Sequence, residues 1–156
     1  MSDAPASLER TGGCQCGAVR YIVRGSPTGA GICHCRMCQK AGGAPFMAFA
    51  GVRGSEFEVS RGAIATFRSS EIAERGFCAQ CGTPLTYRVL GRDRVSFTLG
   101  SLDRPGEVAP ADQLAIEARL PWFDGLPALP GVTMQRWLEK TNFAPIVSRQ
   151  HPDHET

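Results

Sequence analysis

The chain has 156 residues, of which 42% are hydrophobic and 21% charged, and a formal net charge of +2 at pH 7. These values are typical of one soluble globular domain and exclude a chain dominated by disorder. The 17 basic and 15 acidic residues are interspersed, so no basic patch favours nucleic acid as a partner, and no apolar run is long enough to span a membrane.

Short segments of alternating or continuous apolar residues, separated by glycine and proline, predict a mostly β fold. Residues 113–118 are a candidate for one further strand, and the segment 101–131, rich in proline and glycine, is expected to wrap the sheets. From Thr133 onwards Met134, Trp137 and Leu138 share one helical face, which predicts a short helix with Thr133 as its N-cap. The main strands, largely antiparallel, are expected at residues 18–24, 45–52, 56–60, 63–68, 71–77, 84–90 and 95–99.

The sequence predicts a single domain over residues 11–147, with a flexible N-terminus at 1–10 and a flexible tail at 148–156. Residues 1–11 are polar and lack the apolar segment of a signal peptide, which predicts a cytoplasmic protein. In such a reducing compartment, closely spaced cysteines are expected to be metal ligands or catalytic thiols rather than disulfides.

All seven cysteines lie in three tight groups. An odd number leaves one thiol unpaired in any disulfide scheme, and neighbouring Cys-x-Cys or Cys-x-x-Cys pairs suit two thiolates on one metal better than an unstrained disulfide. Thiolate ligands predict zinc, although iron also binds such sites. The groups are Cys14 and Cys16; Cys33, Cys35 and Cys38; and Cys78 and Cys81.

Seven ligands are one short of two closed four-cysteine zinc sites, and a reactive zinc keeps one position open. The first and last groups each end in Cys-Gly and precede a predicted strand, so Cys14, Cys16, Cys78 and Cys81 make an economical closed site. The spacing alone also allows other partitions, such as Cys35 and Cys38 with the last pair. Among the histidines, His34 lies between two candidate ligands and is expected to turn away, either to a supporting role or to solvent, and His151 and His154 are expected to be solvated.

Four segments resemble the glutathione-dependent formaldehyde-activating family, which includes the centromere-protein-V type. The resemblance covers approximately residues 11–130, and one departure is visible: Gln113 stands where many members have histidine. The segments are Thr11-Gly-Gly-Cys-Gln-Cys-Gly17, Cys33-His-Cys-Arg-Met-Cys-Gln-Lys40, Phe77-Cys-Ala-Gln-Cys-Gly-Thr-Pro-Leu85 and Leu120-Pro-Trp-Phe-Asp-Gly-Leu-Pro127.

This resemblance implies a tent-like, zinc-containing β fold with two zinc ions per chain. It implies a structural zinc on Cys14, Cys16, Cys78 and Cys81, and an exchangeable catalytic zinc on Cys33, Cys35 and Cys38. The implied activity is of the carbon–sulfur lyase type, the condensation of glutathione with formaldehyde, with no nucleic acid or membrane as partner.

Three functions stay open on the sequence: an enzyme acting on a thiol adduct of a small electrophile, a non-catalytic glutathione or thiol carrier, and a structural two-zinc interaction protein. Trp122 and Phe123 are candidates either for a pocket wall or for core packing. The cations that are candidates for steering an anionic thiol are Arg36, Lys40, Arg75 and Arg88.

Overall fold

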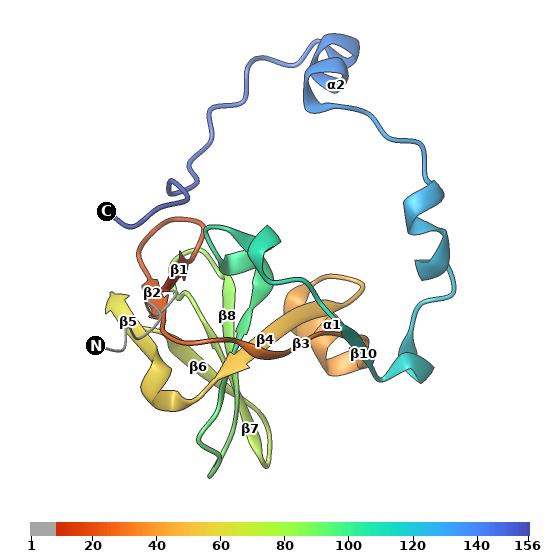
Figure 1. Cartoon of the computed structure of the whole chain (residues 1–156). Coiled ribbons are helices and arrows are strands. Elements are labelled where there is room, and N and C mark those ends of the chain that lie inside the picture. Colours follow the sequence, from red (N-terminus) through yellow and green to blue (C-terminus); the bar gives the residue numbers. More distant parts are fainter. Residues whose placement is uncertain (1–8) are drawn as a thin grey trace, which may run out of the picture.

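The computed structural model describes residues 9–156, and these form two β-sheets (Figure 1). The smaller sheet has the strand order β1-β2-β5, and the larger one has the order β10-β3-β4-β9-β8-β7-β6. The mostly β, antiparallel prediction is confirmed, with one parallel pair, β10 with β3. The strands are β1 (Arg10–Gly13), β2 (Arg20–Val23), β3 (Thr28–Cys33), β4 (Met47–Val52), β5 (Phe57–Arg61), β6 (Ala65–Ser70), β7 (Ala73–Phe77), β8 (Pro84–Val89), β9 (Val95–Thr98) and β10 (Asp112–Leu114).

The helices are short, as the sequence predicts. In the predicted C-terminal helix, the Thr133 side chain accepts a hydrogen bond of 3.2 Å from the backbone N–H of Arg136, which confirms Thr133 as the N-cap. The α-helices are α1 (Arg36–Gly42) and α2 (Met134–Thr141). The 3₁₀ helices are η1 (Gly54–Glu56), η2 (Leu99–Ser101), η3 (Pro105–Glu107), η4 (Ile116–Ala118) and η5 (Phe123–Ala128).

Among the strands and α-helices, three are absent from the sequence-based prediction: β1, β3 and α1. β3 has the sequence Thr-Gly-Ala-Gly-Ile-Cys, in which only the first and fifth residues favour strands. It forms because its backbone pairs with strands on both sides, antiparallel with β4 and parallel with β10. These three elements carry or flank cysteines, so the missed structure lies around the candidate metal sites.

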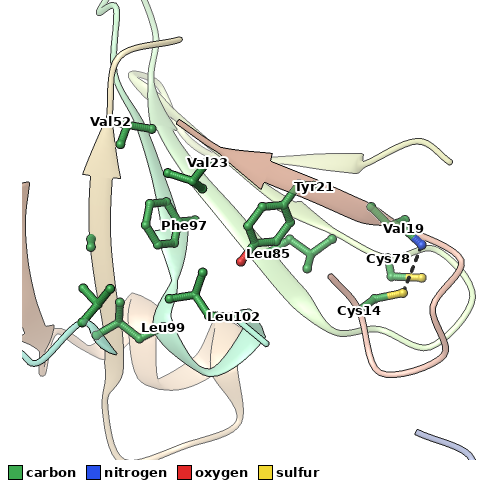
Figure 2. Close-up of a cluster of buried hydrophobic side chains, with 12 residues drawn as sticks. Cys14, Val19, Tyr21, Val23, Val52, Cys78, Leu85, Phe97, Leu99 and Leu102 are labelled. Carbon is green, nitrogen blue, oxygen red and sulfur yellow. Dashed lines mark hydrogen bonds between the residues drawn. The ribbon is translucent and has the colours of Figure 1, made fainter. Parts of the chain in front are cut away.

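The core fills the space between the two sheets (Figure 2). Tyr21 of β2 and Phe97 of β9 are fully buried there, and the Tyr21 ring stacks on Phe57 of β5 with 4.9 Å between the centroids. The Tyr21 hydroxyl is 2.7 Å from the Ser101 Oγ, so its polar end is satisfied inside the core. Burial of side chains of this size stabilises the contact between the sheets by about 1.5–3 kcal/mol per residue.

The large sheet has a second face, which points away from the core and can carry a functional site. Residues paired directly across neighbouring strands point to the same face. Ala50 pairs with Phe97 and lies on the core face, whereas Gly51 pairs with Ser96, Ser96 with Tyr87, and Tyr87 with Arg75. The register therefore places a row of residues from four strands on the face opposite the core.

After η4 the chain leaves the sheets, and α2 stands away from both of them before the C-terminus returns to the region of β1 and β2 (Figure 1). The returning tail makes specific contacts: the His151 backbone N–H donates to Gln15 O at 2.7 Å, and the Glu155 carboxylate accepts from buried Arg20 at 3.2 Å. Within residues 9–156 no helix is both long enough and apolar enough to cross a membrane. The predicted flexible ends stay predictions, and residues 1–8 lie outside the described part of the chain.

Candidate metal centres

The first and last cysteine groups meet in the folded chain. The sulfur atoms of Cys14, Cys16, Cys78 and Cys81 all lie within 4.8 Å of one another, and we call them the four-cysteine cluster. The first two follow β1, and the last two occupy the turn between β7 and β8. This cluster therefore joins the small sheet to the large one.

The two turns of the four-cysteine cluster have matching geometry. Gly17 and Gly82 both have a φ of 77°, a left-handed conformation that side chains disfavour. The Gly17 N–H donates to Cys14 O at 3.1 Å, and the Gly82 N–H donates to Cys78 O at 2.9 Å. The glycine that ends each motif thus allows the turn that brings its two sulfurs together.

Hydrogen-bond donors face the sulfurs of this cluster. The Val19 backbone N–H lies 3.2 Å from Cys14 Sγ at the edge of the core (Figure 2). The Thr83 hydroxyl is 3.2 Å from Cys81 Sγ. Burial acts to raise the pKa of Cys81, but the hydrogen bonds with Thr83 and Cys16 together outweigh it and lower that pKa to about 6. Donors of this kind stabilise the thiolate form that a metal requires.

The middle group forms a separate three-cysteine cluster, in which the sulfurs of Cys33, Cys35 and Cys38 lie within 4.8 Å of one another. Cys33 ends β3, Cys35 is the N-cap residue of α1, and Cys38 lies in the first turn of that helix. The Cys35 Sγ accepts a hydrogen bond of 3.4 Å from the Cys38 backbone N–H. The strand end and the helix start therefore direct all three thiols to one point.

Arg75 of β7 extends across the face of the large sheet opposite the core and contacts this cluster. Its guanidinium donates to Cys38 Sγ at 3.3 Å and lies over the Tyr87 ring, 5.1 Å from the centroid. Burial raises the pKa of the Cys38 thiol to about 12, and the Arg75 hydrogen bond acts against this rise. A fixed positive charge beside the sulfur thus favours its thiolate form.

His34 is fully buried, which excludes the solvated alternative. Its Nε2 is 2.9 Å from Gln113 Oε1, its backbone N–H donates to Leu114 O at 3.0 Å, and its ring meets the Phe123 ring edge-on at 4.7 Å. Nε2 donates to the amide oxygen of Gln113, and Nδ1 is buried without a hydrogen-bond partner. His34 thus supports the loop that carries Cys33 and Cys35 and stands outside both cysteine clusters.

The three-cysteine cluster opens into a cavity of about 290 Å³, which we call the cysteine cavity. Its walls come from β3, α1, β4, β7, β8, β9 and β10, and they are mainly apolar. The residues besides the three cysteines are Gly29, Gly31, Ile32, Met37, Phe49, Arg75, Tyr87, Ser96, Asp112 and Leu114.

The other residues singled out in the sequence lie elsewhere. Arg36 and Lys40 line a different cavity of about 380 Å³, which is bounded by Trp122 on one side. Arg88 is exposed and adjoins none of these cavities. Phe123 packs against His34 instead of facing a ligand space. Of the four candidate cations, Arg75 alone reaches the cysteine cavity.

The chemistry of both donor sets suits a metal ion. Each cluster offers only sulfur ligands, at separations that allow one ion to contact all of them, and each has hydrogen-bond donors directed at sulfur. Both clusters are therefore capable of binding a metal, one with four ligands and the other with three. The alternative that groups Cys35 and Cys38 with the last pair does not correspond to the sulfurs that lie together.

Known proteins share this sequence pattern and fold. A relative from Schizosaccharomyces pombe, named an uncharacterized lyase, is 32% identical over 79 residues, and the match spans 51% of this chain but only 57% of that relative. A crystal structure of a Rhodobacter sphaeroides protein has a TM-score of 0.54 at 23% identity, covering 66% of this chain and 98% of that chain, which shows a shared fold. Residues 9–118 match the family model described as glutathione-dependent formaldehyde-activating enzyme. The chain therefore belongs to the glutathione-dependent formaldehyde-activating enzyme family, as its cysteine motifs predict.

Proposed function

We propose that this protein is a zinc-dependent enzyme of the carbon–sulfur lyase type, similar to S-(hydroxymethyl)glutathione synthase. It would join or cleave the adduct of a thiol, glutathione in the first instance, with formaldehyde or a related small electrophile. One zinc, on Cys14, Cys16, Cys78 and Cys81, would be structural, and the second, on Cys33, Cys35 and Cys38, would be catalytic.

The observation that carries this proposal is the three-cysteine cluster at the wall of the cysteine cavity. Three thiolates leave one position of a tetrahedral zinc for another ligand, and the adjoining volume gives a small thiol room to approach. Zinc at such a site supplies Lewis acidity and a thiolate-stabilising charge. Membership of the family and the lyase name of the S. pombe relative support the same chemistry.

The reaction itself is balanced without an oxidant or reductant. In the forward direction the thiol sulfur forms a bond to the aldehyde carbon, the carbon–oxygen π bond opens, and the thiol proton is transferred to the oxygen. The residues of the chain bind and orient the reactants: the apolar walls exclude water, and the Arg75 guanidinium places a positive charge beside the sulfurs.

A second candidate is a thiol carrier that binds glutathione without turnover. The observation in its favour is the scarcity of general bases, since Asp112 is the only carboxylate among the residues that line the cysteine cavity. His34, the nearest histidine in the sequence, is buried with its Nε2 held by Gln113. Thiols also add to formaldehyde unaided, so binding and catalysis have to be measured separately.

Metal content and exchange kinetics test the proposal. The zinc-loaded protein is expected to contain two ions per chain, one removed by mild chelation and one retained until unfolding. Exchange NMR of glutathione with formaldehyde is expected to show faster adduct formation with the protein than without it. Cys35→Ser should abolish this acceleration.

The outcomes separate the candidates. Thiol binding without acceleration would leave the carrier and reject the enzyme. Two equally inert zinc ions, or unchanged thiol binding in Cys35→Ser, would reject an open site altogether.

A further inference from the structure

A second cavity adjoins the cysteine cavity on the same face of the large sheet. It has a volume of about 370 Å³, and we call it the arginine cavity. Tyr87 of β8 and Ser96 of β9, a directly paired couple, line both cavities. Because these two side chains form the shared wall, the two cavities are neighbouring parts of one groove. The other residues of the arginine cavity are Val89, Arg92, Asp93 and Arg94.

The guanidinium of Arg94 is held in a fixed position in this groove. Its two terminal nitrogens donate to Thr28, one to Oγ1 at 2.9 Å and the other to the carbonyl oxygen at 2.7 Å. A Cβ atom on Gly51 would lie 2.5 Å from the guanidinium, and one on Gly29 would lie 3.1 Å from it. Two glycines on adjacent strands thus provide the space for this side chain, and Gly29 also lines the cysteine cavity.

The charge of Arg94 is not neutralised by an acid. Among the described residues neither Arg92 nor Arg94 forms an ion pair, and the Asp93 carboxylate between them accepts a hydrogen bond of 2.9 Å from the Gly54 N–H. Both hydrogen bonds of Arg94 go to uncharged groups, and a guanidinium has five N–H donors, so several remain available. A fixed, unpaired guanidinium is suited to bind a carboxylate.

The one cation that lines the cysteine cavity, Arg75, lies beside the sulfurs and not at a distance from them. Arg75 is already engaged with Cys38 and lies over Tyr87, and Asp112 adds a negative charge at the opposite wall. Consider a ligand whose sulfur lies at the three-cysteine cluster. Its negatively charged group is therefore most stable beyond the wall formed by Tyr87 and Ser96, next to Arg94.

We propose that the two cavities form one extended substrate groove, in which Arg94 binds a carboxylate of the thiol whose sulfur enters at the three-cysteine cluster. This inference rests on the proposed function, since it assumes that a thiol enters there. The ligand class is a peptide-like thiol with a carboxylate at a distance from its sulfur, and Arg94 determines the preference for anionic over neutral thiols.

Calorimetric titration of the zinc-loaded protein with two thiols tests this assignment. The probes are glutathione and its diethyl ester, which has the same thiol but no carboxylate. Arg94→Gln is expected to weaken glutathione binding about 10-fold, the loss of one charge-assisted contact, and to change ester binding less than about 2-fold. Arg94→Lys should restore part of the preference, because it keeps the charge but not the planar donor geometry.

Arg68→Gln is the matched control. Arg68 also donates to backbone carbonyls, Ser70 O at 3.0 Å and Glu71 O at 2.7 Å, but it lines neither cavity. It should leave the binding of both thiols unchanged.

The outcomes separate this inference from the proposed function. Unchanged glutathione binding in Arg94→Gln, or an equal loss for both thiols, would overturn the role of Arg94 and leave thiol entry intact. If the wild-type protein binds neither thiol, the proposed function fails and the inference fails with it.

Discussion

The contact between His34 and Gln113 shows how a residue outside the cysteine motifs shapes the three-cysteine cluster. His34 is buried between two cysteines, and Gln113 comes from β10, far along the chain. The amide oxygen can only accept, so it selects the His34 tautomer that carries the proton on Nε2. Many family members have a histidine at the position of Gln113, as noted from the resemblance, and a histidine there would not impose the same tautomer.

Gln113→Ala tests this contact. We expect the free energy of unfolding to fall by about 1 kcal/mol, the net value of one hydrogen bond, because Gln113 is itself exposed and water can replace its oxygen. The measurement is urea denaturation of the zinc-loaded protein. The control is Gln135→Ala, which removes an amide bonded only to exposed Glu139 and should have almost no effect. Equal stability of the two variants would contradict the supporting role of Gln113.

The residues of the sites were predictable to different degrees. Spacing alone indicated metal-binding cysteines but allowed several partitions, and the separation into four and three was implied by the resemblance to the family, because the ligand pairs that meet in one cluster lie far apart in the sequence. Gln113 and Arg94 carry no motif: their roles depend on β10 pairing with β3 and on two glycines that make room for a side chain. Such contacts are set by the register between strands, which a single sequence does not determine.

At the scale of elements, α1 is the segment that places Cys38. It has only seven residues and its N-cap is Cys35, a residue type that rarely caps helices, so neither its length nor its start indicates a helix. Its C-cap residue is Gly43, which has a φ of 59° and whose N–H donates to Gln39 O. This left-handed glycine is the strongest end signal in the segment.

Gly43→Ala isolates the backbone cost of that helix end. No atom lies within 4 Å of a Cβ placed on Gly43, so the expected loss of about 1 kcal/mol comes from the left-handed conformation alone. Gly43→Asn should lose less, since asparagine tolerates this conformation. Thermal unfolding measures both. Gly100→Ala, which is equally unobstructed but has no positive φ, is the control and should be nearly neutral.

Strands that the local sequence pattern favours were predicted, whereas strands that depend on pairing with distant segments were not. Segments with alternating or β-branched residues were predicted within a few residues of their observed bounds, because the local pattern itself favours a strand, even in β5 and β6, which are largely exposed. β1 and β3 are rich in glycine and depend on backbone pairing with strands elsewhere in the chain. The whole of segment 113–118 was a candidate strand, but only its first two residues belong to β10, and Ile116–Ala118 form η4.

At the scale of the whole molecule, one ion-pair network connects three distant segments. Buried Arg20 of β2 donates to Asp103 at 2.5 Å and 2.8 Å, and the tail residue Glu155 lies 3.2 Å from the same guanidinium. Burial acts to raise the pKa of Asp103, but the hydrogen bonds from Arg20 and Thr11 outweigh it and lower that pKa. The sequence does not indicate this network, because Arg20 occupies what resembles an ordinary strand position.

Arg20→Met should destabilise the fold by about 3 kcal/mol or more, because it leaves the nearly buried Asp103 carboxylate without a positive charge, with the Thr11 hydroxyl still donating to it. Denaturant unfolding at neutral pH measures this loss. Arg104→Met removes an exposed pair with Glu107 and should change stability by less than about 1 kcal/mol. Similar losses of stability in the two variants would contradict the larger effect expected from breaking the buried ion pair of Arg20.

The two cysteine clusters should also differ in their effect on the whole fold. Cys78 is buried, and its cluster joins the two sheets, so Cys78→Ser is expected to lower the melting temperature of the zinc-loaded protein steeply or to prevent folding. Cys35 lies at a helix start next to a cavity, so Cys35→Ser should lower the melting temperature much less. Scanning calorimetry compares them, and the reverse order would contradict a structural role for the four-cysteine cluster.

The single parallel pair in the large sheet also sets an order of assembly. β10 must return to lie beside β3 after the whole antiparallel part of the sheet has been synthesised. A growing chain has all four sulfurs of the four-cysteine cluster once Cys81 is made, whereas Asp112 and Leu114, which line the cysteine cavity, are added later. The wall of the cysteine cavity is therefore completed on a framework whose sheets can already be joined.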